Sequence, residues 1–130
     1  MREIKFRAWD KELHEFVDIN NTAIDPTNGD VIEVGGYELL DVNHFAILEQ
    51  YTGLKDKNGV DIYEGDIVKV LDGEFVEDPY YAYLEIRYAQ GKFYFHNAYA
   101  VTFDDVLDGD LLDVKVIGNI HENADLLEEQ

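Results

Sequence analysis

The stretch YTGLKDKNGVDIYEGDIVKV, residues 51–70, best defines the fold of this chain. Asn58–Gly59 predicts a two-residue hairpin turn of type I′, because both residues accept positive φ. Gly65 permits a second tight turn, in which Asp66 can hydrogen-bond the following backbone as an Asx turn. The closing letters DIVKV alternate as a strand with a valine face does. The stretch therefore predicts short strands joined by glycine turns.

The same stretch loosely resembles a phosphate-binding loop. Five residues separate Gly53 from Gly59, where the loop pattern needs four, and Val60 stands where it needs a lysine. No long helix pattern follows. The stretch is therefore interpreted as turns and strands, without a nucleotide site.

Three adjacent charged residues in this stretch are not needed by the turn: Lys55, Asp56 and Lys57. They are candidate contacts with a partner protein. The alternative is that they solvate an exposed turn.

Outward from this stretch, strand patterns dominate the chain. At the start, Ile4, Phe6 and Ala8 alternate with polar residues, which predicts a strand with one wet face. HFAILEQY is a strand or a two-turn helix. The other predicted elements are a strand with Leu13, Val17 and Ile19, a loop at Asn20–Asp30, hairpins around Gly35–Gly36 and Gln90–Gly91, strands in AYAVTF and VKVIGNI, a turn or helical turn in DDVLDGDLLD, and a terminal helix in HENADLLEEQ that Asn123 caps and Leu126 and Leu127 dock.

This pattern amounts to roughly eight short strands and one or two short helices, without βαβ spacing or internal repeats. It predicts a mainly β fold, a small barrel or roll of short antiparallel strands. Residues 1–53 are expected to form an N-terminal β extension and residues 54–130 the barrel, unless residues 1–130 form one compact domain.

The composition is strongly acidic, with a formal net charge of −19 and a pI near 4.2. Such a surface repels nucleic-acid phosphates, so no nucleic-acid partner is expected. It favours a basic protein partner, or it keeps the protein soluble. The sequence lacks a signal-peptide pattern and any apolar run of membrane-spanning length, so a cytoplasmic protein without membrane contact is expected.

Several classes of chemistry are excluded by residue type. The chain has no serine and no cysteine, which removes both nucleophiles, and its threonines are internal. The four histidines are scattered without metal-ligand spacing. A calcium loop starting at Asp104 fails, because Val106 and Lys115 stand at ligand positions. No catalytic, cofactor-binding or metal residues are predicted, and no cofactor.

Three blocks together resemble the YopX family of bacteriophage and prophage proteins: REIKFRAWD, YTGLKDKNGVDIYEGDIVKV and VIGNIHENADLL. Two positions depart from the family pattern, Ala124 where proline is usual and His121 where tyrosine is usual. Residues 73–113 carry no matching pattern. The resemblance implies a phage or prophage origin, residence in the bacterial cytoplasm and an SH3-like β-barrel. It assigns no catalytic residue.

Three functions are compatible with these observations. The first is a phage accessory protein of non-enzymatic kind that binds another protein, and homo-oligomers are plausible. The second is an acidic DNA mimic that inhibits a host DNA-binding enzyme. The third is an enzyme using paired carboxylates, since 29 acids leave such a pair open.

Overall fold

A computed structural model of the chain describes residues 4–35, 38–70, 83–96, 101–102, 107–108, 111–112 and 114–128. The described residues are mainly β-strand, and the one α-helix among them is α2 (Asp125–Glu128). The predicted mainly β class, built of curled sheets of short antiparallel strands with a short helix, is confirmed.

The chain divides into two compact units. The N-terminal unit is Lys5–Gln50, and the C-terminal unit contains Tyr51–Gln130. The expected boundary between segments 1–53 and 54–130, and the alternative of one compact domain, both stay predictions.

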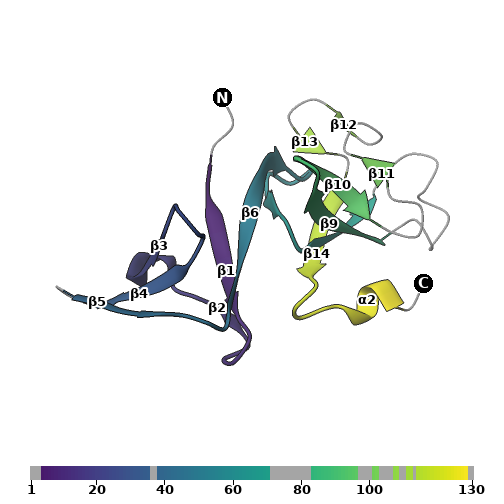
Figure 1. The fold of residues 1–130 in the computed structure, drawn as a ribbon. Helices are drawn as coiled ribbons and strands as arrows, with labels where there is room; N and C mark the ends of the chain where they lie inside the picture. The colour runs from purple at the N-terminus through teal and green to yellow at the C-terminus, as the bar shows by residue number, and fades with distance from the viewer. Residues whose placement is uncertain are drawn as a thin grey trace. The chain divides into compact units, whose positions relative to one another are not determined.

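In the N-terminal unit, β1 lies between two strands, as Figure 1 shows in purple and blue. β1 (Phe6–Asp10) pairs antiparallel with β2 (Glu15–Phe16) and with the first half of β6 (Ala46–Lys55). HFAILEQY is therefore a strand.

The predicted single wet face of β1 is wrong. Ile4 precedes the strand and is 76% exposed, while Trp9 is buried beside Ala8. Because consecutive residues of a strand point to opposite faces, buried Ala8 and Trp9 place a buried side chain on each face of β1. Its Arg7 lies opposite Glu49 of β6.

A second sheet of this unit has the order β3-β4-β5. The predicted hairpin of β4 and β5 is confirmed, although Gly36 of its turn lies outside the described residues. The predicted loop over Asn20–Asp30 is too long, because Thr22–Ile24 pairs with β4. The bounds are η1 (Ile19–Asn21), β3 (Thr22–Ile24), β4 (Val31–Gly35) and β5 (Glu38–Val42).

The C-terminal unit is built on a curled five-stranded sheet, a half-barrel, with the order β11-β10-β9-β8-β14 (Figure 1). The bounds are β7 (Asp61–Tyr63), β8 (Asp66–Val70), β9 (Tyr83–Ala89), β10 (Lys92–His96), β11 (Val101–Thr102), β12 (Leu107–Asp108), β13 (Leu111–Leu112) and β14 (Val114–Asn119). Burial of apolar area stabilises this sheet. Its buried core consists of Ile62, Val68, Leu84, Ile86, Phe93, Phe95 and Val114.

Two hairpin turns of this unit differ from each other. Gln90 and Gly91 both have positive φ, 54° and 80°, as a type I′ turn requires. Asn58 does not, whereas Gly59 has φ of 82°. The predicted type I′ turn at Asn58–Gly59 is therefore wrong, although the hairpin itself is present between β6 and β7.

The acid-rich DDVLDGDLLD was predicted as a turn or a helical turn, and part of it lies outside the described residues. Its described residues form β12 and β13, which pair antiparallel. β13 then meets Lys55 of β6 in a parallel pairing through Leu111. Of the acids considered for a calcium loop, Asp104, Asp105 and Asp110 lie outside the described residues.

The terminal helix is present, but Asn123 does not serve it as predicted. Its side-chain Oδ1 accepts a hydrogen bond from the Asn119 N–H, which precedes it in the chain. Its backbone carbonyl accepts from the Leu126 N–H at 3.0 Å.

Candidate functional site

The loop between β6 and β7 is organised around the carboxylate of Asp56, which is fully buried. Its Oδ1 accepts hydrogen bonds from the N–H groups of Asn58 at 2.8 Å and Val60 at 2.9 Å. Its Oδ2 accepts from the Val116 N–H of β14 at 2.9 Å. Gly59 closes the turn by donating to the Asp56 carbonyl at 3.0 Å. One buried carboxylate therefore accepts three of the hydrogen bonds that hold this loop.

The two lysines beside Asp56 make different contacts. Lys55 forms an ion pair with Asp61 across the hairpin, and its side chain is 44% exposed. Lys57 is exposed, and its backbone N–H donates to the Val114 carbonyl at 2.9 Å. Partner contact by Lys55, Asp56 and Lys57 stays a prediction. In this fold the two lysine side chains reach the surface, and the buried Asp56 carboxylate fixes the loop that carries them.

Before this loop, β6 contains a bulge at Gly53. Gly53 has φ of 87°, and the pairing with β7 shifts register between Tyr51 and Lys55. Thr52 is buried there and donates its hydroxyl to the Ile62 carbonyl at 2.8 Å. The polar groups at the bulge are thus bound within the hairpin.

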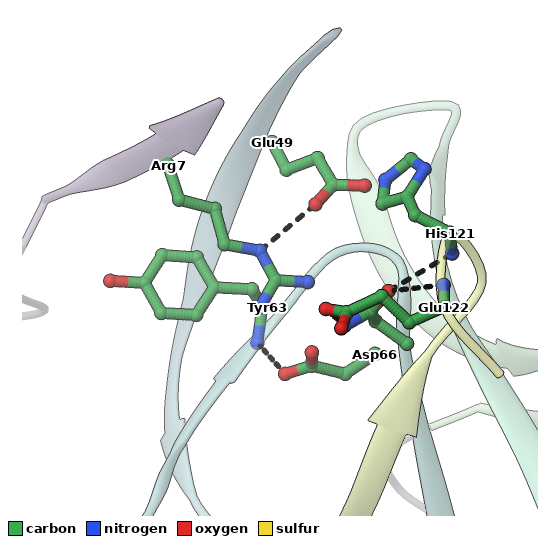
Figure 2. Close-up of polar contacts among 7 residues, drawn as sticks. Arg7, Glu49, Tyr63, Asp66, His121 and Glu122 are labelled. Carbon is green, nitrogen blue, oxygen red and sulfur yellow. Dashed lines mark hydrogen bonds and ion pairs between the residues drawn. The ribbon is translucent and has the colours of Figure 1, made fainter. Parts of the chain in front are cut away.

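A second polar cluster contains Asp66, the first residue of β8, and Asn119, the last residue of β14, which pair across the two strands. Both side chains are buried. Asp66 Oδ2 accepts from the Tyr63 N–H at 2.8 Å, which fixes the turn at Gly65 (φ 87°). Figure 2 shows this contact among its sticks. The Asp66 carboxylate thus reaches the backbone before it, three residues back.

Asn119 holds the chain that follows β14. Its Oδ1 accepts from the N–H groups of His121 and Glu122, both at 3.0 Å, and its Nδ2 donates to the Glu122 carboxylate at 3.0 Å. Figure 2 labels His121 and Glu122 at this turn. Glu122 is exposed and His121 half-buried. His121, one of the two departures from the family pattern, therefore lies on a turn held by the buried Asn119 amide.

These contacts bring together residues far apart in the sequence. The loop at residue 56 meets β14 at residue 116, and the Ile120 N–H donates to the Gly65 carbonyl at 2.9 Å. The second and third blocks of the family resemblance thus form one structural cluster. Sequence reasoning missed it, because neither block alone shows a partner for its buried acids.

The N-terminal unit has its own ionic contacts. Arg7 Nε and Glu49 Oε1 are 2.9 Å apart, and the Glu49 side chain is 4% exposed (Figure 2). The Arg7 guanidinium also lies 4.7 Å from the ring centroid of Phe16. Asp10 is also buried and accepts from the Leu13 N–H at 3.0 Å. The Leu13 N–H and then the Asn43 amide hold the pKa of Asp10 below its ordinary value of 3.8.

A third cluster occupies the non-core face of β9 and β10. Arg87 and Glu85 form an ion pair at 3.1 Å, and His96 lies directly across from Glu85. Burial and then the Arg87 charge lower the pKa of His96 below 6.5. Tyr94 packs edge-on against His96, with ring centroids 6.2 Å apart. The signal for this cluster was the alternation within the Gln90–Gly91 hairpin.

Two features are absent from the described residues. Nowhere in them do three His, Asp or Glu side chains gather as a metal site would need. None of the helices in that part of the chain has the length and hydropathy of a membrane span.

The geometry thus defines a small, mainly β protein in which motif acids fix loops onto a half-barrel. The sequence model of the family described as YopX protein matches residues 5–128. The chain therefore belongs to the YopX family, which confirms the resemblance.

Two solved structures are similar to this chain along nearly its whole length. The crystal structure of protein EF1440 from Enterococcus faecalis is 31% identical, covers 98% of this chain and 99% of its own, and has a TM-score of 0.58. The X-ray structure of protein yopX from Bacillus subtilis is 21% identical, with coverage of 98% and 99% and a TM-score of 0.57. The second likeness shows the fold alone. No curated protein matches the chain.

Proposed function

We propose that this chain is a non-enzymatic protein-interaction module, encoded by a phage or prophage and acting in the cytoplasm of its bacterial host. The observation that best supports this proposal is the hydrogen bonding of Asp56 and Asp66, the two buried acids of residues 51–70. Asp56 directs both carboxylate oxygens at backbone N–H groups, and Asp66 directs Oδ2 at the Tyr63 N–H. These acids stabilise loops.

A catalytic carboxylate has a different requirement. A general base needs an oxygen within hydrogen-bond reach of the proton that it removes from the substrate. Asp56 is fully buried and holds three N–H groups, so substrate would have to displace the hydrogen bonds that form the loop. A role in positioning surface residues for a partner fits this geometry better than a role in chemistry.

Charge indicates the kind of partner. A net charge of −19 steers basic surfaces toward the protein and slows approach of nucleic-acid phosphates. The proposed partner is therefore a protein with a basic surface. On the loop between β6 and β7, the proposed partner contacts are Lys55, which also pairs with Asp61, exposed Lys57, and Asp56, which fixes the loop from inside.

Affinity purification tests this function. Tagged protein is incubated with lysate of a bacterial host, washed at low and at high salt, and the bound proteins are identified by mass spectrometry. We expect one enriched, stoichiometric protein whose recovery falls at high salt, because charge attraction between surfaces is screened. If only the tagged protein itself is enriched, and light scattering shows that it forms an oligomer, self-assembly replaces partner binding as the proposed function.

A further inference from the structure

Three exposed apolar side chains lie at one end of the β1–β6 pair. Leu13 is 62% exposed, Phe45 48% and Ile47 37%. Leu13 lies in the turn after β1, Phe45 in the turn before β6, and Ile47 opposite Trp9 on β6. Single exposed apolar residues are ordinary, whereas large contiguous apolar patches mark interaction sites. Leu13 and Phe45 lie on two turns that are hydrogen-bonded to each other. We call Leu13, Phe45 and Ile47 the turn surface.

The two turns that carry this surface are joined by buried Asp10. Its Oδ1 accepts from the N–H groups of Glu12 at 2.8 Å and Leu13 at 3.0 Å. Its Oδ2 accepts from Asn43 Nδ2 at 3.0 Å, and Asn43 Oδ1 accepts from the Phe45 N–H at 2.9 Å. One carboxylate thus fixes the backbone at both Leu13 and Phe45.

A backbone bond adds to this link, since the Lys11 N–H donates to the Phe45 carbonyl at 3.0 Å. Ordering a flexible turn on binding costs free energy, so turns that are already fixed bind with less loss. These hydrogen bonds fix the backbone of the two turns, while the side chains of Leu13 and Phe45 stay partly exposed.

The unit that carries the turn surface is acidic. Glu12 and Glu15 are exposed in and beside the turn after β1, together with one exposed lysine, Lys11. The whole N-terminal unit has ten acids against three Lys and Arg, a net charge of −7. A second copy of the chain would bring the same negative unit to this surface, so charge opposes self-association there.

We propose that the turn surface binds a basic amphipathic segment of another protein. Apolar side chains of that segment cover Leu13, Phe45 and Ile47, and its Lys or Arg side chains lie over Glu12 and Glu15. This inference rests on the proposed function and specifies the chemistry of the partner. Helices with one apolar and one basic face are a recurring form of such segments.

The probe is a synthetic fluorescent helical peptide with leucines on one face and lysines on the other, and binding is followed by anisotropy. Leu13→Ser with Phe45→Ser is the test variant. Val60→Ser is the control, because Val60 is equally an exposed apolar residue, 48%, but belongs to the C-terminal unit. Neither change should alter stability by more than about 0.5 kcal/mol, since the side chains are at the surface.

We expect the test variant to bind the peptide at least about tenfold more weakly and the control to bind as the original does. A peptide with glutamate in place of lysine should not bind. The proposal is overturned if the original protein does not bind the basic peptide, if the test variant binds equally well, or if light scattering shows a dimer that the test variant loses.

The lysate purification separates the two proposals. If the test variant retains the same partner as the original protein, the interaction function stands and this surface is the wrong one. If the original protein enriches no partner, the proposed function itself fails.

Discussion

The carboxylate of Asp56 and the backbone N–H of Val116 lie 2.9 Å apart, joined across 60 residues of sequence. β14 is an end strand of the five-stranded sheet, and such strands expose unpaired backbone groups. Here the loop supplies partners along the open side, because Lys57 N–H also donates to the Val114 carbonyl at 2.9 Å. The loop thereby closes part of the half-barrel without being a strand.

Asp56→Asn should destabilise the protein by about 2–4 kcal/mol. Asparagine keeps one acceptor oxygen, and its NH₂ group then faces either the loop N–H groups or the Val116 N–H. Two donors face each other there, so at least one backbone N–H loses its acceptor. Urea unfolding measures the loss. Hydrogen exchange measures its location, and the Val116 amide should lose protection while core amides of β9 exchange only as fast as the lower global stability requires.

Lys57→Gln is the matched control. Lys57 contributes its backbone N–H to the same edge, which the substitution keeps, and its side chain is exposed. The unfolding free energy of the Lys57→Gln variant should differ from that of the original protein by less than about 0.5 kcal/mol. If Asp56→Asn were no more destabilising than this control, the closing role of the carboxylate would be wrong.

Gly118 and Asn123 depend on each other within one block of sequence, VIGNIHENADLL. A Cβ at Gly118 would lie 2.3 Å from Asn123 Oδ1 and 2.6 Å from Cγ. Gly118→Ala should therefore expel the Asn123 side chain, break its bond to the Asn119 N–H, and cost about 1–3 kcal/mol in the unfolding free energy.

A double-variant cycle checks this cause. In an Asn123→Gly background the obstructing side chain is absent, so adding Gly118→Ala should cost clearly less than it does alone. Additive losses would assign the effect to the backbone at Gly118. Gly59→Ala serves for comparison, because its Cβ meets nothing within 4 Å and its φ is 82°, so its cost of about 1–2 kcal/mol is conformational and independent of Asn123.

Much of the fold follows from local sequence, since turns and alternation are local properties. Gly65, Gly59 and Gly53 all take positive φ, as glycines in a stretch of short strands should. The hairpin at Gln90–Gly91 and the strand DIVKV were predicted for the same reason. These features need no knowledge of distant residues.

The candidate site was predicted less well, because one of its contacts is long-range and others replace the local structure that a residue suggests. Asp56 in the sequence is one of three charged neighbours on a turn, and its burial becomes clear only when Val116 is beside it. Asn58 suggested a type I′ turn, but the Asp56 carboxylate stabilises a different one, with Gly59 alone at positive φ. Asn123 suggested a helix cap, yet it lies over Gly118.

Gln90 offers a stabilising change. It has φ of 54°, in the left-handed region where a side chain without a short polar group is strained. Asparagine is the preferred residue at that place before glycine in a type I′ turn. Gln90→Asn should raise the unfolding free energy by about 0.5–1 kcal/mol, measured in urea. Asn58→Gln, where φ is not positive, is the control and should not show the converse loss of that size.

Asp10 should make the N-terminal unit sensitive to acid. Its pKa is lowered by the Leu13 N–H and then by the Asn43 amide, so the folded state favours the charged form. The stability that this contributes is present above the ordinary value of 3.8 and is lost as the pH falls through the lower folded pKa. Asp10→Asn should be destabilised at pH 6, and the gap to the original should narrow as the pH falls below about 4. A constant gap across that range would contradict the prediction.

His96 should give a second pH dependence, near neutrality and of the same sign. Its pKa is lowered mainly by burial and then by the positive charge of Arg87, against the opposing effect of Glu85. Its buried Nδ1 has no hydrogen-bond partner within the described part of the chain, so a proton there gains no acceptor. The unfolded state therefore binds this proton more readily, and stability falls as the pH drops below about 6.5 toward the folded pKa.

His96→Phe tests this dependence, because phenylalanine keeps an aromatic ring beside Tyr94 and binds no proton. Unfolding free energies of both proteins are measured in urea at pH 7.5 and pH 5.0. The original protein should lose stability relative to the variant on acidification, since all other titrating groups are shared. Because Arg87 disfavours the charged imidazole, Arg87→Gln should shrink the loss that acidification causes, and an unchanged loss would leave burial as its sole cause.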